Sequence, residues 1–260
     1  MKTAQEYKDS LRERKIRVYV KGQLLDSREV IDHPFIRGHV NSAAMTYALA
    51  GNPEYADLMT TTSHLTGHKI NRFTHIHQSV DDLMKKAKML RTISQKTGTC
   101  YQRCVGFDAM NATYTVTYEC DKALGTNYHE RFKKFLIQVQ DNDWMVAGAM
   151  TDVKGDRSLR PGQQVDPDMF VHVVEKREDG IVIRGAKAHM TDMVNSHWML
   201  IMPTMGMLDE RGPVRRLLRR SRGRPGVTDI LRPSAPTMTA SARAPSTRAM
   251  PTTASSAASA

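Results

Sequence analysis

Trp144-Met145-Val146-Ala147-Gly148-Ala149-Met150 is an unbroken apolar run that ends at Thr151-Asp152, and it separates two kinds of sequence. Residues 1–141 before it carry helical spacing, whereas the residues after it carry short β-branched runs. A helical region followed by a β region is the order of an α+β fold, unlike the alternating order of parallel α/β folds. Neither a Gly-x-Gly-x-x-Gly nor a P-loop motif occurs. The chain is therefore predicted to be α+β, with a helical domain over residues 1–141.

The helical pattern is clearest after residue 79. Ser79-Val80-Asp81-Asp82 has the form of a capping box, in which a hydroxyl precedes a carboxylate by three positions. Apolar residues then recur at three- and four-residue spacing, which predicts an amphipathic helix along Leu83, Met84, Ala87, Leu90 and Ile93. Shorter helical patterns cover residues 3–14, 43–49 and 128–140, and the flanks of residues 114–118 also favour a helix.

Residues 142–208 are predicted to begin an antiparallel β domain. The β-branched runs 170–175 and 181–186 are joined through Glu178-Asp179-Gly180, which is typical of a hairpin turn. Residues 198–205 form a further apolar run that predicts another strand.

The positive charge is concentrated at one end of the chain. The 260 residues hold 38 Lys and Arg against 27 Asp and Glu, a net charge of +11. Ten of the basic residues and one acidic residue fall in residues 211–260, which leaves 28 and 26 in residues 1–210. Because the body is nearly neutral, attraction to a phosphate backbone is not its main property, and we expect no nucleic-acid partner.

Residues 209–260 differ in composition from the rest of the chain. An arginine-rich stretch is followed by a Ser-, Thr-, Ala- and Pro-rich run, a composition that predicts disorder. With the reading frame moved by one base and GC-rich codons, residues 236–253 can begin Pro-Asp-Asp-Asp-Ser-Leu-Arg-Ala-Gly, which looks like folded protein. We therefore interpret the segment as a disordered basic tail that a frameshift produced. A basic arm for RNA or an anionic membrane, and a tail without a role, are the alternatives.

Several classes of protein are excluded by composition. Residues 1–17 are charged throughout, unlike a signal peptide, and no apolar run approaches the roughly 20 residues of a membrane helix. Three cysteines are too few for a secreted disulfide scaffold of this length. Apolar residues make up 40% of the chain and charged residues 25%, which is ordinary for a globular protein. We expect a cytoplasmic protein without membrane contact.

Cys100-Tyr101-Gln102-Arg103-Cys104 is the first candidate for chemistry. If the segment is helical, the two thiols share one face, with about 5–6 Å between their Cβ atoms. In a reducing compartment such a pair indicates half of a metal or cluster site, since an iron–sulfur centre takes four protein ligands. Two buried cysteines that pack as small hydrophobes are the alternative, which the spacing alone slightly favours. Cys120 has no partner at useful spacing and is expected in the core.

Two further segments carry weaker patterns. Residues 150–157 follow the apolar run with a glycine and two cations, and could present backbone N–H groups and positive charge to a phosphate or a flavin. An ordinary polar turn has the same composition. On a strand, His189 and Thr191 would face the same side and could bind a ligand, although a lone strand histidine is more often structural. The histidines of the helical half, including His75-Ile76-His77, form too common a pattern to indicate a metal site.

Taken in order, these segments resemble the 4-hydroxybutyryl-CoA dehydratase (vinylacetyl-CoA Δ-isomerase) family, within the flavin superfamily of 4-hydroxyphenylacetate 3-monooxygenase. The resemblance runs from about residue 3 to residue 207 and rests on the segments Asp32-His33-Pro34, Leu58-Met59-Thr60-Thr61, Lys69-Ile70-Asn71-Arg72-Phe73, Gln95-Lys96-Thr97, Cys100-x-x-x-Cys104, Gly125-Thr126-Asn127-Tyr128-His129, 150–157 and 175–189. It implies an acyl-CoA-dehydrogenase-like fold whose later β strands and C-terminal helical bundle are missing from this chain.

The resemblance also implies specific roles. Cys100 and Cys104 would be two of the four ligands of a [4Fe-4S] cluster, and catalytic positions would fall on Gln102 and Thr191. The FAD-binding positions would be Met150, Thr151, Asp152, Val153, Lys154, Gly155, Asp156, Arg157, His189 and Thr191. The substrate would be an acyl-CoA thioester, and the family assembles as a homo-tetramer. The remaining cluster ligands, a histidine and a cysteine, lie beyond the end of the match in the family, as does a glutamate base.

The implied reaction is dehydration of 4-hydroxybutyryl-CoA to crotonyl-CoA, with isomerisation of vinylacetyl-CoA. Because two of four cluster ligands are missing, we expect the chain by itself to be inactive. Two alternatives remain open at this point. One is the oxygenase component of a flavin-dependent 4-hydroxyphenylacetate 3-monooxygenase, which lacks the cluster cysteines. The other is an inactive truncated fragment that binds a flavin or a partner.

Overall fold

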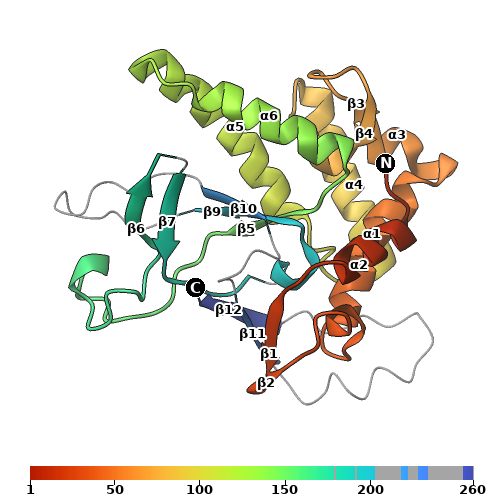
Figure 1. Cartoon of the computed structure of the whole chain (residues 1–260). Coiled ribbons are helices and arrows are strands. Elements are labelled where there is room, and N and C mark those ends of the chain that lie inside the picture. The colour runs from red at the N-terminus through yellow and green to blue at the C-terminus, as the bar shows by residue number, and fades with distance from the viewer. Residues whose placement is uncertain (179, 191, 203–217, 222–227, 234–253, 260) are drawn as a thin grey trace.

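A computed structural model describes residues 1–178, 180–190, 192–202, 218–221, 228–233 and 254–259. Within these ranges, residues 1–141 are mainly helical, as predicted (Figure 1). The helices are α1 (Ala4–Arg12), α2 (Arg37–Ala50), the single-turn α3 (Ala56–Met59), α4 (Val80–Thr97), α5 (Cys104–Leu124) and α6 (Tyr128–Asp141). The helix expected around residues 114–118 is confirmed, as part of α5. Thr3 and Glu6 form a capping box at α1, and the Ser79 hydroxyl caps α4 by accepting from the Asp82 amide.

The side of α4 that enters the core differs from the predicted apolar stripe. Met89 and Ile93 are fully buried, but Leu83 and Met84 are 50% and 55% exposed. Asp82 explains the rotation, because its carboxylate points inward to Arg72 and His75. Positions 82, 89 and 93 lie on one helical face, so anchoring the carboxylate inside leaves Leu83 and Met84 outside.

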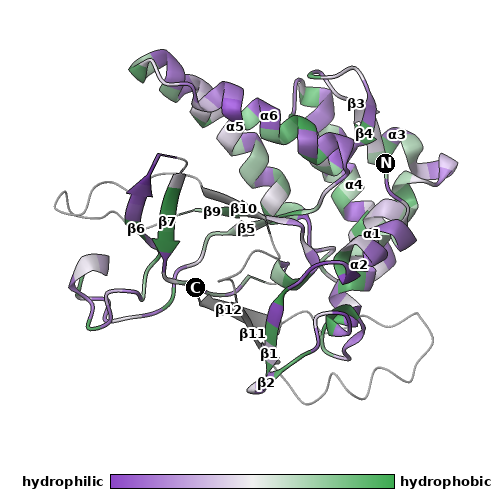
Figure 2. Cartoon of the chain, viewed as in Figure 1, coloured by the Kyte–Doolittle hydropathy of each residue, from purple (hydrophilic) through white to green (hydrophobic). Residues whose placement is uncertain are grey.

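Short strands complete the helical region. They are β1 (Arg17–Val20), β2 (Gln23–Leu24), β3 (Thr60–Thr62) and β4 (Lys69–Asn71), none of which the sequence patterns predict. The hairpins β1–β2 and β3–β4 are antiparallel. The α5–α6 helical hairpin extends away from the sheets in Figure 1, and Figure 2 shows hydrophobic and hydrophilic residues alternating along it. No helix in the described part of the chain is long and apolar enough to cross a bilayer.

The β region begins where predicted, with β5 (Val146–Ala149) directly after α6. The predicted hairpin is confirmed as the antiparallel pair β6 (His172–Arg177) and β7 (Gly180–Arg184). The predicted strand after residue 198 is β9 (Trp198–Ile201). However, β9 pairs with β5 in parallel, so the expectation of a purely antiparallel domain is wrong. The intervening residues 150–197 are long enough to make the crossover that a parallel pair needs.

Part of the segment expected to be disordered forms strands, against that expectation. Within residues 209–260 the structure describes β10 (Leu218–Ser221), β11 (Thr228–Pro233) and β12 (Ala254–Ser259). They extend the sheets β10-β9-β5 and β2-β1-β11-β12-β8, where β8 is Ala186–Lys187. The physical reason is that open edges of β1 and β9 offer unpaired backbone groups, which can pair with a chain of almost any composition. The rest of the tail prediction lies outside the described residues.

Candidate functional site

The two cysteines of the Cys100-x-x-x-Cys104 motif lie in contact, but not on one helix. Helix α4 ends at Gly98, in the left-handed conformation, and α5 begins only at Cys104. The prediction of a shared helical face is therefore wrong, because a turn intervenes. In this turn the Gln102 amide donates to Cys100 Sγ at 3.4 Å, and the Cys104 thiol hydrogen-bonds Cys100. Both thiols are half-buried and neither forms a disulfide.

The contact makes the two thiols chemically unequal. The hydrogen bond from Cys104 lowers the pKa of Cys100, against the opposing effect of burial and with help from the Gln102 amide. The same bond raises the pKa of Cys104, and burial adds to the increase. Cys100 is therefore the thiol of the pair that deprotonates more readily. A thiolate is the form in which cysteine binds a metal, so the geometry suits ligation by both sulfurs.

Gln102 sits between the cysteines in a strained conformation. Its φ is +65°, which is uncommon for a residue with a side chain, and its side chain is buried with 2% of the residue exposed. Its Nε2 donates to the Cys100 carbonyl at 3.3 Å, while its Oε1 is buried without a hydrogen-bond partner. A buried acceptor without a donor costs free energy, so this amide oxygen is suited to a ligand that brings a donor.

Glycines hold the cysteine turn against strand β5. An ideal Cβ on Gly106, in the first turn of α5, would lie 1.7 Å from the Val146 carbonyl oxygen. One on Gly148 would lie 2.3 Å from Val105 Cγ1. Only glycine permits this approach, which brings the start of α5 onto the backbone of β5. Since β5 leads directly into residues 150–157, the first and second predicted segments are neighbours in space.

Residues 150–157 form a loop that is held in place by buried side chains. Lys187 Nζ donates to the carbonyl oxygens of Met150 at 3.0 Å and Met202 at 2.8 Å, and it pairs with the Asp152 carboxylate. The Lys187 side chain is 3% exposed, and burial lowers its pKa. The Asp152 carboxylate therefore faces this lysine.

The second half of the loop is held by Gln164. Its Oε1 accepts from the Asp156 amide at 3.0 Å, and its Nε2 donates to the Asp156 and Leu159 carbonyls at 2.8 and 3.1 Å. Gly155 packs on the same amide, because a Cβ there would lie 2.3 Å from Gln164 Oε1. The outer positions are exposed, and they are the side chains of Met150, Lys154, Asp156 and Arg157; Thr151 and Val153 are half-buried. The loop thus presents two cations on a fixed backbone.

The third segment lies close to the other two, although not as a strand. Strand β8 ends at Lys187, and His189 is exposed with a φ of +54°, so the predicted strand face through His189 is wrong. Thr191 lies outside the described residues. Asp192, the next residue, is buried, and its negative charge adds to the rise in the pKa of Cys104 that the Cys100 hydrogen bond and burial cause.

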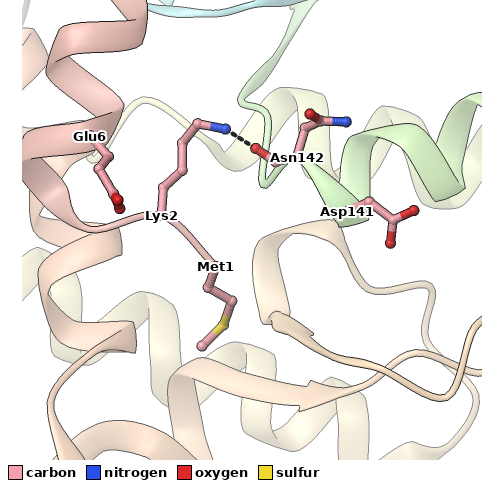
Figure 3. Close-up of a pocket in the computed structure, with 5 residues that line it drawn as sticks. All are labelled: Met1, Lys2, Glu6, Asp141 and Asn142. Carbon is pink, nitrogen blue, oxygen red and sulfur yellow. Dashed lines mark hydrogen bonds between the residues drawn. The ribbon is translucent and has the colours of Figure 1, made fainter.

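Two side chains that organise these segments are not found by sequence patterns, namely Gln164 and Lys187. Each acts on a backbone or carboxylate that lies far away in sequence or in an irregular loop, so no periodicity marks it. Among the described residues no group of three or more His, Cys, Asp or Glu side chains could hold a metal ion. Cys120 is half-buried on α5. An open pocket of about 380 Å³ lies elsewhere, lined by Met1, Lys2, Glu6, Asp141 and Asn142 (Figure 3).

The sequence of the chain is similar to those of known proteins. The family model described as 4-hydroxyphenylacetate 3-hydroxylase N terminal matches residues 3–254. The 4-hydroxybutyryl-CoA dehydratase/vinylacetyl-CoA-Δ-isomerase of Clostridium aminobutyricum is 56% identical over 207 residues, which cover 80% of this chain and 42% of that protein. The 4-hydroxyphenylacetate 3-monooxygenase oxygenase component of Thermus thermophilus is 25% identical over 190 residues, 73% of this chain and 38% of that protein.

Solved structures give the same result. An oxygen-tolerant archaeal 4-hydroxybutyryl-CoA dehydratase from N. maritimus superposes with a TM-score of 0.89 at 40% identity, covering 99% of this chain and 51% of that one. An FAD complex of a 4-hydroxyphenylacetate 3-monooxygenase oxygenase component superposes with a TM-score of 0.76 at 20% identity, covering 100% of this chain and 52% of that one, and so shows the fold alone. The chain spans about half the length of the relatives it matches.

Proposed function

Because the chain belongs to the 4-hydroxyphenylacetate 3-hydroxylase N-terminal family, we propose that it supplies the N-terminal half of a 4-hydroxybutyryl-CoA dehydratase and vinylacetyl-CoA Δ-isomerase site. The observation that carries the proposal is the contact between the thiols of Cys100 and Cys104 beside the buried, unpartnered oxygen of Gln102. The greater identity to the two dehydratases, 56% and 40%, agrees with this choice over the two monooxygenase components reported above, at 25% and 20%.

The residues fit two cofactors in different degrees. The two thiols suit half of a [4Fe-4S] site, which takes four protein ligands. Since the described residues offer no third ligand nearby, the other half would come from residues outside them or from another chain. The loop 150–157, fixed by Lys187 and Gln164, suits FAD, and its exposed Lys154 and Arg157 would pair with the phosphates. His189 and Thr191 complete the proposed flavin contacts, and Thr191 is also the second proposed catalytic residue.

The reaction explains why such a site combines these groups. In a 4-hydroxyacyl thioester the C2 proton is moderately acidic but the C3 hydrogen is not, so eliminating water between C3 and C4 is hard by acid–base catalysis alone. When bound, FAD and the cluster would supply an electron relay and a Lewis acid for the departing hydroxyl. Gln102 would accept a hydrogen bond from the substrate hydroxyl at its free Oε1 and so orient it. The buried turn around Cys100 would exclude water from the reacting carbons.

The finer features of the assembly are part of the same proposal. We infer an acyl-CoA-dehydrogenase-like arrangement, in which residues 142–208 begin the middle β domain and a C-terminal helical bundle completes the site. The whole enzyme would form a homo-tetramer that binds an acyl-CoA thioester. The chain alone would be inactive, because half of the cluster ligands are not on its described residues.

A chimera tests the proposal. Residues 1–202 of this chain would replace the matching part of the Clostridium aminobutyricum dehydratase, and the product would be assayed with 4-hydroxybutyryl-CoA. We expect crotonyl-CoA formation that is lost in the variants Cys100→Ser and Cys104→Ser and kept in Cys120→Ser. Hydroxylation of 4-hydroxyphenylacetate by the chimera, or full activity in both cysteine variants, would overturn the proposal.

A further inference from the structure

Arg103, the residue between Gln102 and Cys104, leaves the cysteine turn and enters the helical core. Its side chain is 3% exposed. The guanidinium carbon lies 4.5 Å from the centre of the Tyr47 ring and 4.9 Å from that of Phe73, and Nη1 donates to Thr46 Oγ1 at 3.1 Å. Contacts of a guanidinium with two aromatic faces, away from water, are among the stronger cation–π geometries.

The charge of Arg103 is balanced by Asp143, at the junction between α6 and β5. Arg103 Nη2 lies 3.5 Å from Asp143 Oδ1, and the aspartate side chain is 1% exposed. Asp143 Oδ2 accepts from the Lys2 amide at 3.2 Å, and its backbone carbonyl accepts from the Tyr47 hydroxyl at 3.1 Å. In Figure 3 the Lys2 side chain reaches the neighbouring Asn142 carbonyl, so the N-terminus covers this junction.

The pair therefore links two parts of the proposed site that are about forty residues apart, the cysteine turn and the start of β5. Gln102 holds a left-handed conformation, which costs on the order of 1–3 kcal/mol and persists only if its surroundings impose it. The next residue supplies such a constraint, because the Arg103 side chain fixes the backbone on the C-terminal side of Gln102.

We propose that Arg103 and Asp143 are positioning residues, which hold the Cys100-x-x-x-Cys104 turn in register with β5 so that both sulfurs and Gln102 Oε1 face one ligand site. The identity of that ligand rests on the proposed function, whereas the geometry of the turn does not. A lysine at 103 would keep the charge yet lose the planar stacking and the fork of donors. Loss of the anchor releases the turn while the surrounding helices stay folded.

Amide hydrogen exchange on the full 260-residue chain tests the geometry. In Arg103→Lys and Asp143→Asn we expect exchange of the amides of residues 101–104 to rise at least tenfold, with the rest of α5 unchanged. The matched control is Arg72→Lys, which disturbs another buried arginine–carboxylate pair, that with Asp82. It should raise exchange around residues 57–60 and 78–82 only. Equal loosening of residues 101–104 in the control, or none in either site variant, would overturn the proposal.

Cadmium binding tests the consequence for ligation. Cd²⁺ bound by two thiolates gives an ultraviolet charge-transfer band, and disturbing a supporting residue typically weakens metal binding by about 10–100-fold. We expect that loss of affinity in Arg103→Lys and wild-type affinity in Arg72→Lys and Cys120→Ser. Unchanged Cd²⁺ affinity in Arg103→Lys would count against a positioning role. If wild type binds no Cd²⁺ while the exchange pattern holds, the ligand role in the proposed function fails and the positioning of the turn stands.

Discussion

Replacing Gly106 by alanine tests whether the close packing of α5 on β5 builds the site. In a helix interior this change normally stabilises, because alanine is favoured over glycine by about 1 kcal/mol. Here the added Cβ would lie 1.7 Å from the Val146 carbonyl oxygen and 2.5 Å from its carbon, both backbone atoms that cannot rotate away. Overpacking in a core costs about 1–3 kcal/mol and sometimes more.

The steric cost should exceed the gain in helix propensity. We expect Gly106→Ala to lower the free energy of unfolding by about 2 kcal/mol or more. For a chain of this size, that corresponds to a drop of roughly 4–8 °C in the midpoint of thermal unfolding. Because α5 must move away from β5, the affinity for FAD should fall as well. Circular dichroism melts and flavin fluorescence titrations measure the two effects.

Gly51→Ala is the matched control. A Cβ on Gly51 would meet its nearest atom, the Ala48 carbonyl oxygen, at 3.6 Å, which is an ordinary contact. The free energy of unfolding of Gly51→Ala should stay within about 0.5 kcal/mol of the wild-type value, which is the range of neutral substitutions. If Gly106→Ala unfolds at or above the wild-type temperature and binds FAD normally, the close approach of α5 to β5 does not exist.

Two further changes probe the supports of the loop 150–157, and a third probes the buried carboxylate at the start of α4. Lys187→Met removes the counter-ion of the buried Asp152 carboxylate and should lower the free energy of unfolding in urea by about 3–5 kcal/mol. Adding Asp152→Leu should recover part of this loss, and an unchanged stability of the single variant would contradict the buried pair. Burial alone would raise the pKa of Asp82, but its hydrogen bonds and neighbouring cations lower it from 3.8 to about 2. Its stabilising effect is therefore present above pH 3.8 and lost as the pH falls toward 2, and Asp82→Asn should remove this step from the acid-unfolding profile; an unchanged profile would refute it. Gln164→Glu keeps an acceptor but removes the donor to two loop carbonyls, which should loosen the loop. Trypsin at pH 8 should therefore cleave within residues 154–160 faster in the variant than in wild type, and equal cleavage rates would contradict this role of Gln164.

The elements with a strong local signal could be predicted, and those fixed by distant partners could not. The helix α4 begins at its predicted cap because Ser79 and Asp82 interact within one turn. Its rotation could not be predicted, since Arg72 and His75 determine it. The β6–β7 hairpin follows from its own β-branched runs and turn. The strand β1 pairs in parallel with β11, which lies more than two hundred residues later, and no local sequence pattern predicts such a pairing.

The candidate site shows the same division. The sequence identifies Cys100 and Cys104 as a candidate pair, but a turn brings them into contact and not their spacing on a helix. Their turn depends on the left-handed Gln102, a conformation that residue type does not predict. In the same way, Asp152 is visible as part of a polar loop, whereas its pairing with Lys187 appears only when β5 and β8 are placed together.

The parallel pairing of β5 with β9 bears on the order in which the chain folds. The pair encloses the 48 residues 150–197, and closing a loop of that length costs about 3–4 kcal/mol of chain entropy before any contact across it repays the loss. Contacts within and between neighbouring helices such as α5 and α6 carry a much smaller penalty, so they form earlier. The loop 150–157 can become ordered only after Gln164 and Lys187, which hold its backbone, have been synthesised. Helices α5 and α6 would then form on the ribosome while the loop 150–157 is still unformed, and substitutions in β9 should slow formation of the β5–β9 pair more than they slow formation of these helices.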